Sequence, residues 1–231
     1  MDSELFRSRA DAGKRLAERL LDYEGEDVIV LAIPRGGVPV GCEVAKRLNA
    51  ELDVIIPRKI PIPWNPEAGF GAITADGTIV LNQRMVSSLE LSKEEIQKIA
   101  DEVREEINRR LTEYRDDRPP PEVEGKTVIL VDDGLASGYT MLAGIESVRK
   151  HKPARVIVAV PVASSGAARL VSPRVDRLVA LITSERLPFA VAEFYREWRD
   201  LTDEEVRECL RNGQWPMVND RRNHGPWTLD H

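Results

Sequence analysis

The chain has 231 residues, of which 42% are hydrophobic and 31% are charged, and its net charge is −6. This length suits one α/β domain with insertions. No stretch approaches the roughly 18 to 20 apolar residues that a membrane span needs, and the negative charge argues against nucleic acid as a partner. The N-terminal sequence is charged and has no secretory pattern, so we expect a cytoplasmic protein that does not contact membranes.

The first quarter of the chain predicts a strand, helix, strand unit. Apolar residues at helical spacing predict an amphipathic helix over residues 4–22, which would cover one face of a sheet. The run DVIVLAI predicts a buried strand over 27–33, followed by a tight loop over 34–37 and a helix over 38–48. A second strand is expected over 52–57, which implies a parallel sheet with a right-handed crossover.

The next segment predicts a lid. Residues 58–69 contain three prolines and a glycine, so we expect a loop there and no regular element. Strands expected over 70–74 and 78–81 flank an Asp-Gly hairpin signal. Residues 58–81 would then form a flexible lid, a loop that returns to the sheet as a β-ribbon.

The middle of the chain predicts an inserted helix and the rest of the sheet. A capping-box pattern at Ser92 and Glu95 begins a helix expected over 92–115, and a proline-rich connector over 116–125 leads back to the sheet. The remaining elements alternate: strand 128–131, helix 139–151, strand 155–160, helix 165–171 and strand 177–182. We therefore predict an α/β fold with an open, mainly parallel, twisted five-stranded sheet, helices on both faces and the strand over 128–131 near its centre.

One domain is expected over residues 1–231, with a core of about 1–183 and a small C-terminal hood and tail over about 184–231. A helix over 203–211 is expected there, capped by Asp200 or Thr202. Cys42 and Cys209 lie far apart and in unlike contexts, so neither a disulfide framework nor a metal cluster is indicated. The histidines His151, His224 and His231 show no metal-ligand spacing.

The most informative stretch is VILVDDGLASGYTM, residues 128–141. Asp132 and Asp133 follow a buried strand and emerge at its carboxyl end, where open α/β sheets place ligands. The turn that follows can direct backbone N–H groups, and the hydroxyls of Ser137 and Thr140, at a phosphate on the next helix N-terminus. Two carboxylates beside an anion site would repel the anion unless a sugar lies between them. A ribose fits, because the carboxylates would accept hydrogen bonds from its two vicinal hydroxyls.

This stretch resembles the phosphoribosyl pyrophosphate (PRPP) signature of type I phosphoribosyltransferases. That signature is an apolar strand, two acidic residues, three variable residues, Thr or Ser, Gly, any residue and Thr. The resemblance implies that PRPP is bound by the signature loop, residues 132–140, which comprises Asp132, Asp133, Gly134, Leu135, Ala136, Ser137, Gly138, Tyr139 and Thr140. With its NPE loop and its late LPFA segment, the chain is most similar to the uncharacterised predicted phosphoribosyltransferases of archaea and bacteria.

The resemblance also implies roles for basic residues and a metal. Arg35, Gly36 and Gly37 stand where the family binds pyrophosphate; the glycines permit close approach and Arg35 adds a permanent charge. Arg58 and Lys59 begin the lid and would close over pyrophosphate, or they are solvated charges. Lys59, Arg35 and Asp133 are the expected catalytic residues. Mg²⁺ is the implied cofactor, held mainly through PRPP or through water by Asp132 or Asp133.

The acceptor is less defined. Ala136 stands where some purine enzymes of the family carry an Asp base, so a hypoxanthine or guanine activity of that type is not expected. The hood residues Pro188, Phe189 and Tyr195 either stack on a planar acceptor or form the core of the hood.

The leading hypothesis is a PRPP-dependent pentosyltransferase of nucleotide metabolism that acts on a nitrogen acceptor, a nucleobase or related amine, and releases pyrophosphate. The alternative is a regulator on the same fold that senses PRPP or a nucleotide without turnover. A different phosphate-ester enzyme is less consistent with the sequence, because no further carboxylate or histidine cluster is present. The sequence leaves open a homodimer, the identity of the acceptor and the role of residues 213–231.

Overall fold

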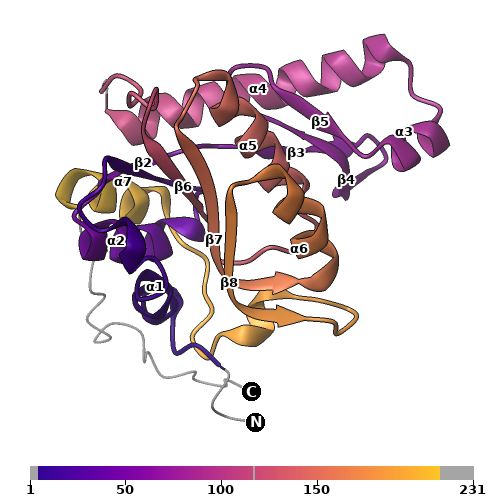
Figure 1. Cartoon of the computed structure of the whole chain (residues 1–231). Helices are drawn as coiled ribbons and strands as arrows, with labels where there is room; N and C mark the ends of the chain where they lie inside the picture. The colour runs from indigo at the N-terminus through magenta and orange to yellow at the C-terminus, as the bar shows by residue number, and fades with distance from the viewer. Residues whose placement is uncertain (1–4, 117, 214–231) are drawn as a thin grey trace, which may run out of the picture.

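The computed structural model describes residues 5–116 and 118–213 (Figure 1). Five parallel strands form the main sheet in the order β2-β1-β6-β7-β8, with β6 at the centre. They are β1 (Val28–Ala32), β2 (Glu51–Val54), β6 (Thr127–Val131), β7 (Arg155–Ser164) and β8 (Arg177–Ser184). Every residue of β1 and β6 is buried, as expected of parallel strands covered on both faces. The predicted five-stranded parallel sheet, with its central signature strand, is confirmed.

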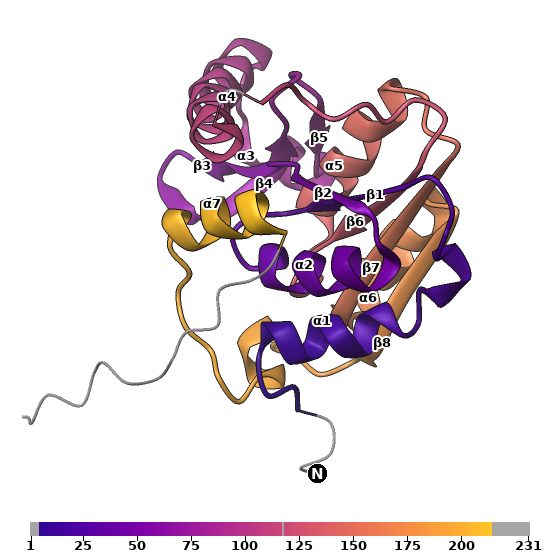
Figure 2. The ribbon, with the colours of Figure 1, turned by 90° about the vertical axis from the view of Figure 1, so that its left-hand side faces the viewer.

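Helices cover both faces of this sheet (Figures 1 and 2). They are α1 (Arg9–Ala17) and α2 (Gly37–Leu48) on one face, and α5 (Tyr139–Lys150) and α6 (Ser165–Val171) on the other. Side chains alternate along each strand: Val30 packs in the core shared with α1 and α2, whereas Leu31 packs in the core shared with α5. No helix in the described part of the chain is long and apolar enough to span a membrane.

The first helix is shorter than the predicted helix over 4–22. The Ser8 side chain accepts from the N–H of Asp11 and caps α1, because it satisfies an otherwise unpaired donor. The helix ends before a 3₁₀ turn, η2 (Leu21–Tyr23). Residues 1–4 lie outside the described part of the chain.

A second, antiparallel sheet corrects the prediction that residues 58–69 form a loop. It consists of β3 (Arg58–Ile62), β4 (Asn65–Ile73) and β5 (Ile79–Leu81), in the order β3-β4-β5. The pairing of β3 with β4 shifts register on both sides of Pro61, so an irregularity accommodates the proline. The strands form because Ile60, Ile62 and Phe70 are buried in a second core, which local sequence does not reveal. The strand predicted over 52–57 also ends earlier, with β2.

Two helices lie between β5 and β6. The predicted helix over 92–115 is α4 (Lys93–Arg115), and its capping box is present. The sequence analysis missed α3 (Gln83–Leu89), which the Asn82 side chain caps. The small sheet packs against both α4 and α5. The predicted Asp-Gly hairpin is also confirmed, because it joins β4 to β5.

The last described helix is α7 (Asp203–Asn212), which lies between α2 and α4 (Figure 2). Thr202 caps it, so the structure selects one of the two predicted caps. Cys209 of α7 pairs with Cys42 of α2 in a disulfide, with the Cα atoms 7.0 Å apart. This corrects the expectation that no disulfide is present. The two residues meet because α7 packs on α2, a contact that spans 167 residues of sequence.

Candidate active site

The carboxyl edge of the main sheet brings two predicted segments together. The signature loop follows β6, and the turn that ends at Gly36 and the start of α2 at Gly37 follows β1. A Cβ atom added at Gly36 would lie 1.9 Å from Asp133 Oδ2, and one at Gly37 would lie 2.7 Å from the Val131 carbonyl oxygen. Neither position accepts a side chain without displacing its neighbour. The structure therefore places both glycines directly against the signature acids.

The rest of the signature loop is fixed at one end by β7 and at the other by α5. The Leu135 N–H donates to the Val162 carbonyl oxygen at 2.8 Å. Gly138 precedes α5 with φ of +85°, a conformation that glycine adopts readily. Ala136 and Ser137 between these points are exposed. Because the first turn of a helix leaves backbone N–H groups without helical partners, this loop is suited to bind an anion.

Asp132 and Asp133 are largely enclosed by protein and have different partners. Asp132 Oδ1 accepts from the backbone N–H of Asp133 at 2.8 Å, whereas Asp133 Oδ2 accepts from Nε of Arg9 at 2.7 Å. Burial raises the pKa of Asp132 well above its usual value, and the neighbouring carboxylate of Asp133 raises that pKa further. Burial also raises the pKa of Asp133, although Arg9 opposes this shift. Ionisation of these two carboxyl groups therefore lowers the stability of the folded state.

Arg9 is a site residue that the sequence analysis missed. It stands three, four and seven residues before Ala12, Gly13 and Leu16, which places it on the buried face of α1. A charged side chain at an apolar position of an amphipathic helix was the available signal.

Of the three predicted hood residues, one contacts the signature loop. The Tyr195 hydroxyl donates to the Asp133 carbonyl oxygen at 2.6 Å, and its ring packs against Phe6 with centroids 5.4 Å apart. Burial and the nearby Asp133 charge raise the pKa of Tyr195. Phe189 is half-buried beside other hood side chains, and Pro188 is exposed. Tyr195 therefore belongs to the core of the hood.

Arg58 and Lys59, the cations of the predicted lid, contact groups other than the signature loop. Arg58 pairs with Glu106 of α4, and the Lys59 ammonium donates to the Glu67 carbonyl oxygen across the β3-β4 hairpin. Lys59 is exposed and Arg58 is half-buried. The contacts described for these residues thus lie within the lid and α4, and they do not reach the signature loop.

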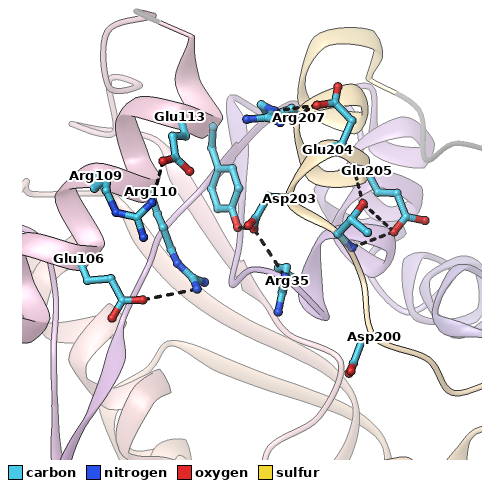
Figure 3. Close-up of polar contacts among 12 residues, drawn as sticks. Arg35, Glu106, Arg109, Arg110, Glu113, Asp200, Asp203, Glu204, Glu205 and Arg207 are labelled. Carbon is cyan, nitrogen blue, oxygen red and sulfur yellow. Dashed lines mark hydrogen bonds and ion pairs between the residues drawn. The ribbon is translucent and has the colours of Figure 1, made fainter.

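Arg35 lies beside the start of α7. Its Nη1 atom is 3.9 Å from Asp203 Oδ1, and Figure 3 shows the two side chains pointing toward each other. The Tyr114 hydroxyl of α4 donates to the same Asp203 oxygen, and burial and that contact raise the pKa of Tyr114. The sequence analysis missed Asp203, because nothing local connects residue 203 with residue 35.

The donor atoms at this edge fit Mg²⁺ that is held largely by a substrate. Among the described residues there is no group of three or more His, Cys, Asp or Glu that could hold a metal ion by itself. Asp132 and Asp133 offer the oxygen ligands that Mg²⁺ prefers, and this cation is usually completed by substrate phosphates and water.

Comparison with known proteins identifies similar chains. Residues 74–191 match the family model described as "Phosphoribosyl transferase domain". That span includes the signature loop, but it excludes Arg9, Arg35, Lys59 and Asp203.

Two relatives match over most of the chain. A Mycobacterium tuberculosis protein (strain H37Rv), Rv0571c, named provisionally as a phosphoribosyl transferase, is 39% identical over 202 residues. The match covers 87% of this chain and 45% of the relative, so the chain spans about half the length of the curated relatives it matches. The crystal structure of TT1426 from Thermus thermophilus superposes with a TM-score of 0.77 at 38% identity, covering 91% of this chain and 99% of that one.

Proposed function

The chain belongs to the phosphoribosyl transferase family, and from this premise we propose that it transfers the 5-phosphoribosyl group of PRPP to a nitrogen acceptor and releases pyrophosphate. The observation that carries the proposal is the close contact of Gly36 and Gly37 with the end of β6 and the signature acids. This contact brings two backbone segments and a pair of carboxylates together at one edge of the sheet.

The arrangement matches the chemistry of PRPP from end to end. The loop before α5 is suited to the 5-phosphate, because a helix N-terminus favours anions. Asp132 and Asp133 would accept the two ribose hydroxyls, and the loop over 35–37 would receive pyrophosphate. A sugar with an anion at each end and vicinal hydroxyls between is the ligand that fits this sequence of groups.

In the reaction, the bond from the anomeric carbon to a pyrophosphate oxygen breaks, a bond to the acceptor nitrogen forms, and the proton on that nitrogen is lost to solvent or to the leaving pyrophosphate. Positive charge develops on the ribose ring and negative charge on the leaving group. Asp132 and Asp133 would stabilise the ring, whereas Arg35 and Lys59 would stabilise pyrophosphate. Lys59 would have to exchange its contact with the Glu67 carbonyl for the substrate. Mg²⁺, when bound, supplies further positive charge to the leaving group.

The acceptor that we propose is a nucleobase or related amine, because such a molecule supplies the nucleophilic nitrogen that the reaction needs. Ala136 offers no base to such an acceptor. Hypoxanthine and guanine, whose transfer in some enzymes of the family uses an Asp base at that position, are therefore not the favoured acceptors. The enzyme would then act in nucleotide metabolism.

The second candidate is a PRPP-sensing regulator that binds without turnover. One observation favours it: the cations that a catalyst needs at pyrophosphate have other partners, Asp203 for Arg35 and Glu67 for Lys59.

Calorimetry with PRPP and Mg²⁺ tests the binding site common to both candidates. We expect the wild type to bind PRPP, and the double variant Asp132→Asn, Asp133→Asn to bind it at least tenfold more weakly while remaining folded. Asp22→Asn is the control, because Asp22 is an exposed carboxylate that pairs with Arg177 far from the signature loop. Equal affinity of the double variant and the wild type would contradict the proposed site.

A further inference from the structure

Arg9 links three parts of the molecule at the signature loop. Its Nε donates to Asp133 Oδ2 at 2.7 Å, and its Nη1 donates to the Arg199 carbonyl oxygen at 2.9 Å. Its guanidinium carbon lies 3.7 Å from the centre of the Trp198 ring. One side chain of α1 thus joins Asp133 of the signature loop to residues 198 and 199, which precede α7.

This contact is enclosed, unlike the exposed ion pair between Arg7 and Glu197, which joins the N-terminal segment to the hood nearby. The side chains of Arg9 and Asp133 are 10% and 15% exposed, whereas those of Arg7 and Glu197 are 80% and 62% exposed. A planar guanidinium that is fixed on one face by Trp198 and on its edge by a carbonyl can hold a carboxylate in one orientation. An exposed pair has little such effect.

We propose that Arg9 is the positioning residue of the PRPP site: it holds Asp133 in the orientation that receives a ribose hydroxyl. Arg9 engages one carboxylate oxygen, and a carboxylate has acceptor capacity for further hydrogen bonds. Tyr195 fixes the backbone of the same residue through its hydroxyl. The side chain and main chain of Asp133 are therefore both set by residues that lie outside the segment shared with the family model.

The inference rests on the proposed function, because it assigns Arg9 a role in PRPP binding. If Arg9 positions Asp133, the effect of an Arg9 substitution on PRPP affinity should depend on the presence of Asp133. Arg9→Met removes both the charge and the fork of donors while keeping an unbranched apolar side chain. It leaves Asp133 enclosed without its partner, so the variant is also made in the Asp133→Asn background, where no unpaired charge remains.

The test is calorimetry of PRPP with Mg²⁺ on folded wild type, Arg9→Met, Arg9→Lys, Asp133→Asn, the Arg9→Met, Asp133→Asn double variant and the control Arg7→Met. We expect Arg9→Met to weaken PRPP affinity by on the order of tenfold or more, as loss of an orienting partner commonly does. Arg9→Lys should recover part of that loss, and Arg7→Met should bind within twofold of the wild type. In the Asp133→Asn background, Arg9→Met should cause no further loss beyond twofold.

Several outcomes overturn the inference. Unchanged or tighter PRPP binding by Arg9→Met would show that Arg9 does not position the acid. An equal loss with and without the Asp133→Asn substitution would show that Arg9 acts independently of residue 133. An equal loss of PRPP affinity in Arg7→Met would show that any contact between the N-terminal segment and the hood has this effect, and that Arg9 has no specific role. Failure of the wild type to bind PRPP would reject the proposed function together with this inference, whereas the other outcomes reject the inference alone.

Discussion

Asp132 is a carboxylate that the fold keeps in an unfavourable place. Burial and the adjacent Asp133 charge both raise its pKa, and its Oδ1 atom accepts the backbone N–H of Asp133. An acid whose pKa is higher in the folded state binds more protons there than in the unfolded chain. Its charge therefore lowers stability at neutral pH, and stability is recovered as pH falls through the raised pKa. Such a cost is expected where a residue serves a ligand.

We predict that Asp132→Asn raises the free energy of unfolding at pH 7 by about 0.5–2 kcal/mol, because the amide removes the buried charge and keeps the acceptor oxygen. Denaturant unfolding at pH 7 and at pH 4 measures it, and the gain should shrink at the lower pH. A variant less stable than the wild type at pH 7 would mean that the ionised carboxylate is well stabilised.

At the same scale, the sequence predicted where the residues of one contiguous stretch lie in the fold. Asp132, Asp133 and Gly138 could be placed because a strand, two acids and a helix start are contiguous. Arg9 and Asp203 could not, since each meets its partner across more than 120 residues and neither lies in a recognisable motif. Tyr195 was named, but its role in the hood core depends on the Asp133 carbonyl, which no pattern specifies.

At the scale of elements, the segment predicted to be a lid forms a small sheet with an exposed end. Ile60, Phe70 and Ile73 are fully buried, whereas residues 63–67 at the β3-β4 turn are exposed. Motion of the predicted lid is therefore expected at the turn, which also carries the Glu67 partner of Lys59.

Limited proteolysis should cut the free protein within residues 63–67 before it cuts the buried parts of β3 or β4. Because Lys59 and its hairpin would close on pyrophosphate, PRPP with Mg²⁺ should slow that cleavage, which mass spectrometry of the fragments can follow. Cleavage in an unrelated exposed segment of the same sample serves as the control. Equal rates at the turn with and without ligand would argue against a lid.

The start of α7 brings negative charge to the loop expected to bind pyrophosphate. Asp203 lies 3.9 Å from Arg35, and Glu204 and Glu205 follow in the same turn. Arg199 engages Glu205, and Arg207 engages Glu204. Asp203 is thus the member of this acidic turn that contacts Arg35.

Asp203→Asn should strengthen pyrophosphate binding about fivefold, since removing one nearby charge in a partly exposed site is worth about 1 kcal/mol. The amide can still accept from the Tyr114 hydroxyl. Glu204→Gln is the matched control, because it removes the same charge one residue further on and away from Arg35. If both variants strengthen binding equally, the effect is one of net charge and not of the Arg35 contact.

At the scale of the whole molecule, the parallel five-stranded sheet with β6 near its centre was predicted from the alternation of apolar strands and helices, whereas the order of the other strands was not predicted. The elements that differed depend on packing between distant segments. The proline-containing strands β3 and β4 form because the small sheet packs against α4 and α5, and the Cys42 pairing forms because α7 docks on α2. Both contacts join parts of the chain whose separation a periodic pattern cannot encode. The predictions for the tail beyond residue 213 lie outside the described residues.

Pyrophosphate release from PRPP tests the central claim most directly. With Mg²⁺ and a panel of nucleobases and small amines, the wild type is predicted to release pyrophosphate in proportion to acceptor consumed. Lys59→Ala should slow that release by on the order of 10² to 10³ with a much smaller loss of PRPP affinity, because charge on the leaving group is greatest in the transition state. No release with any acceptor, together with a Lys59→Ala variant that is impaired only in PRPP binding, would contradict the enzyme and leave the sensor.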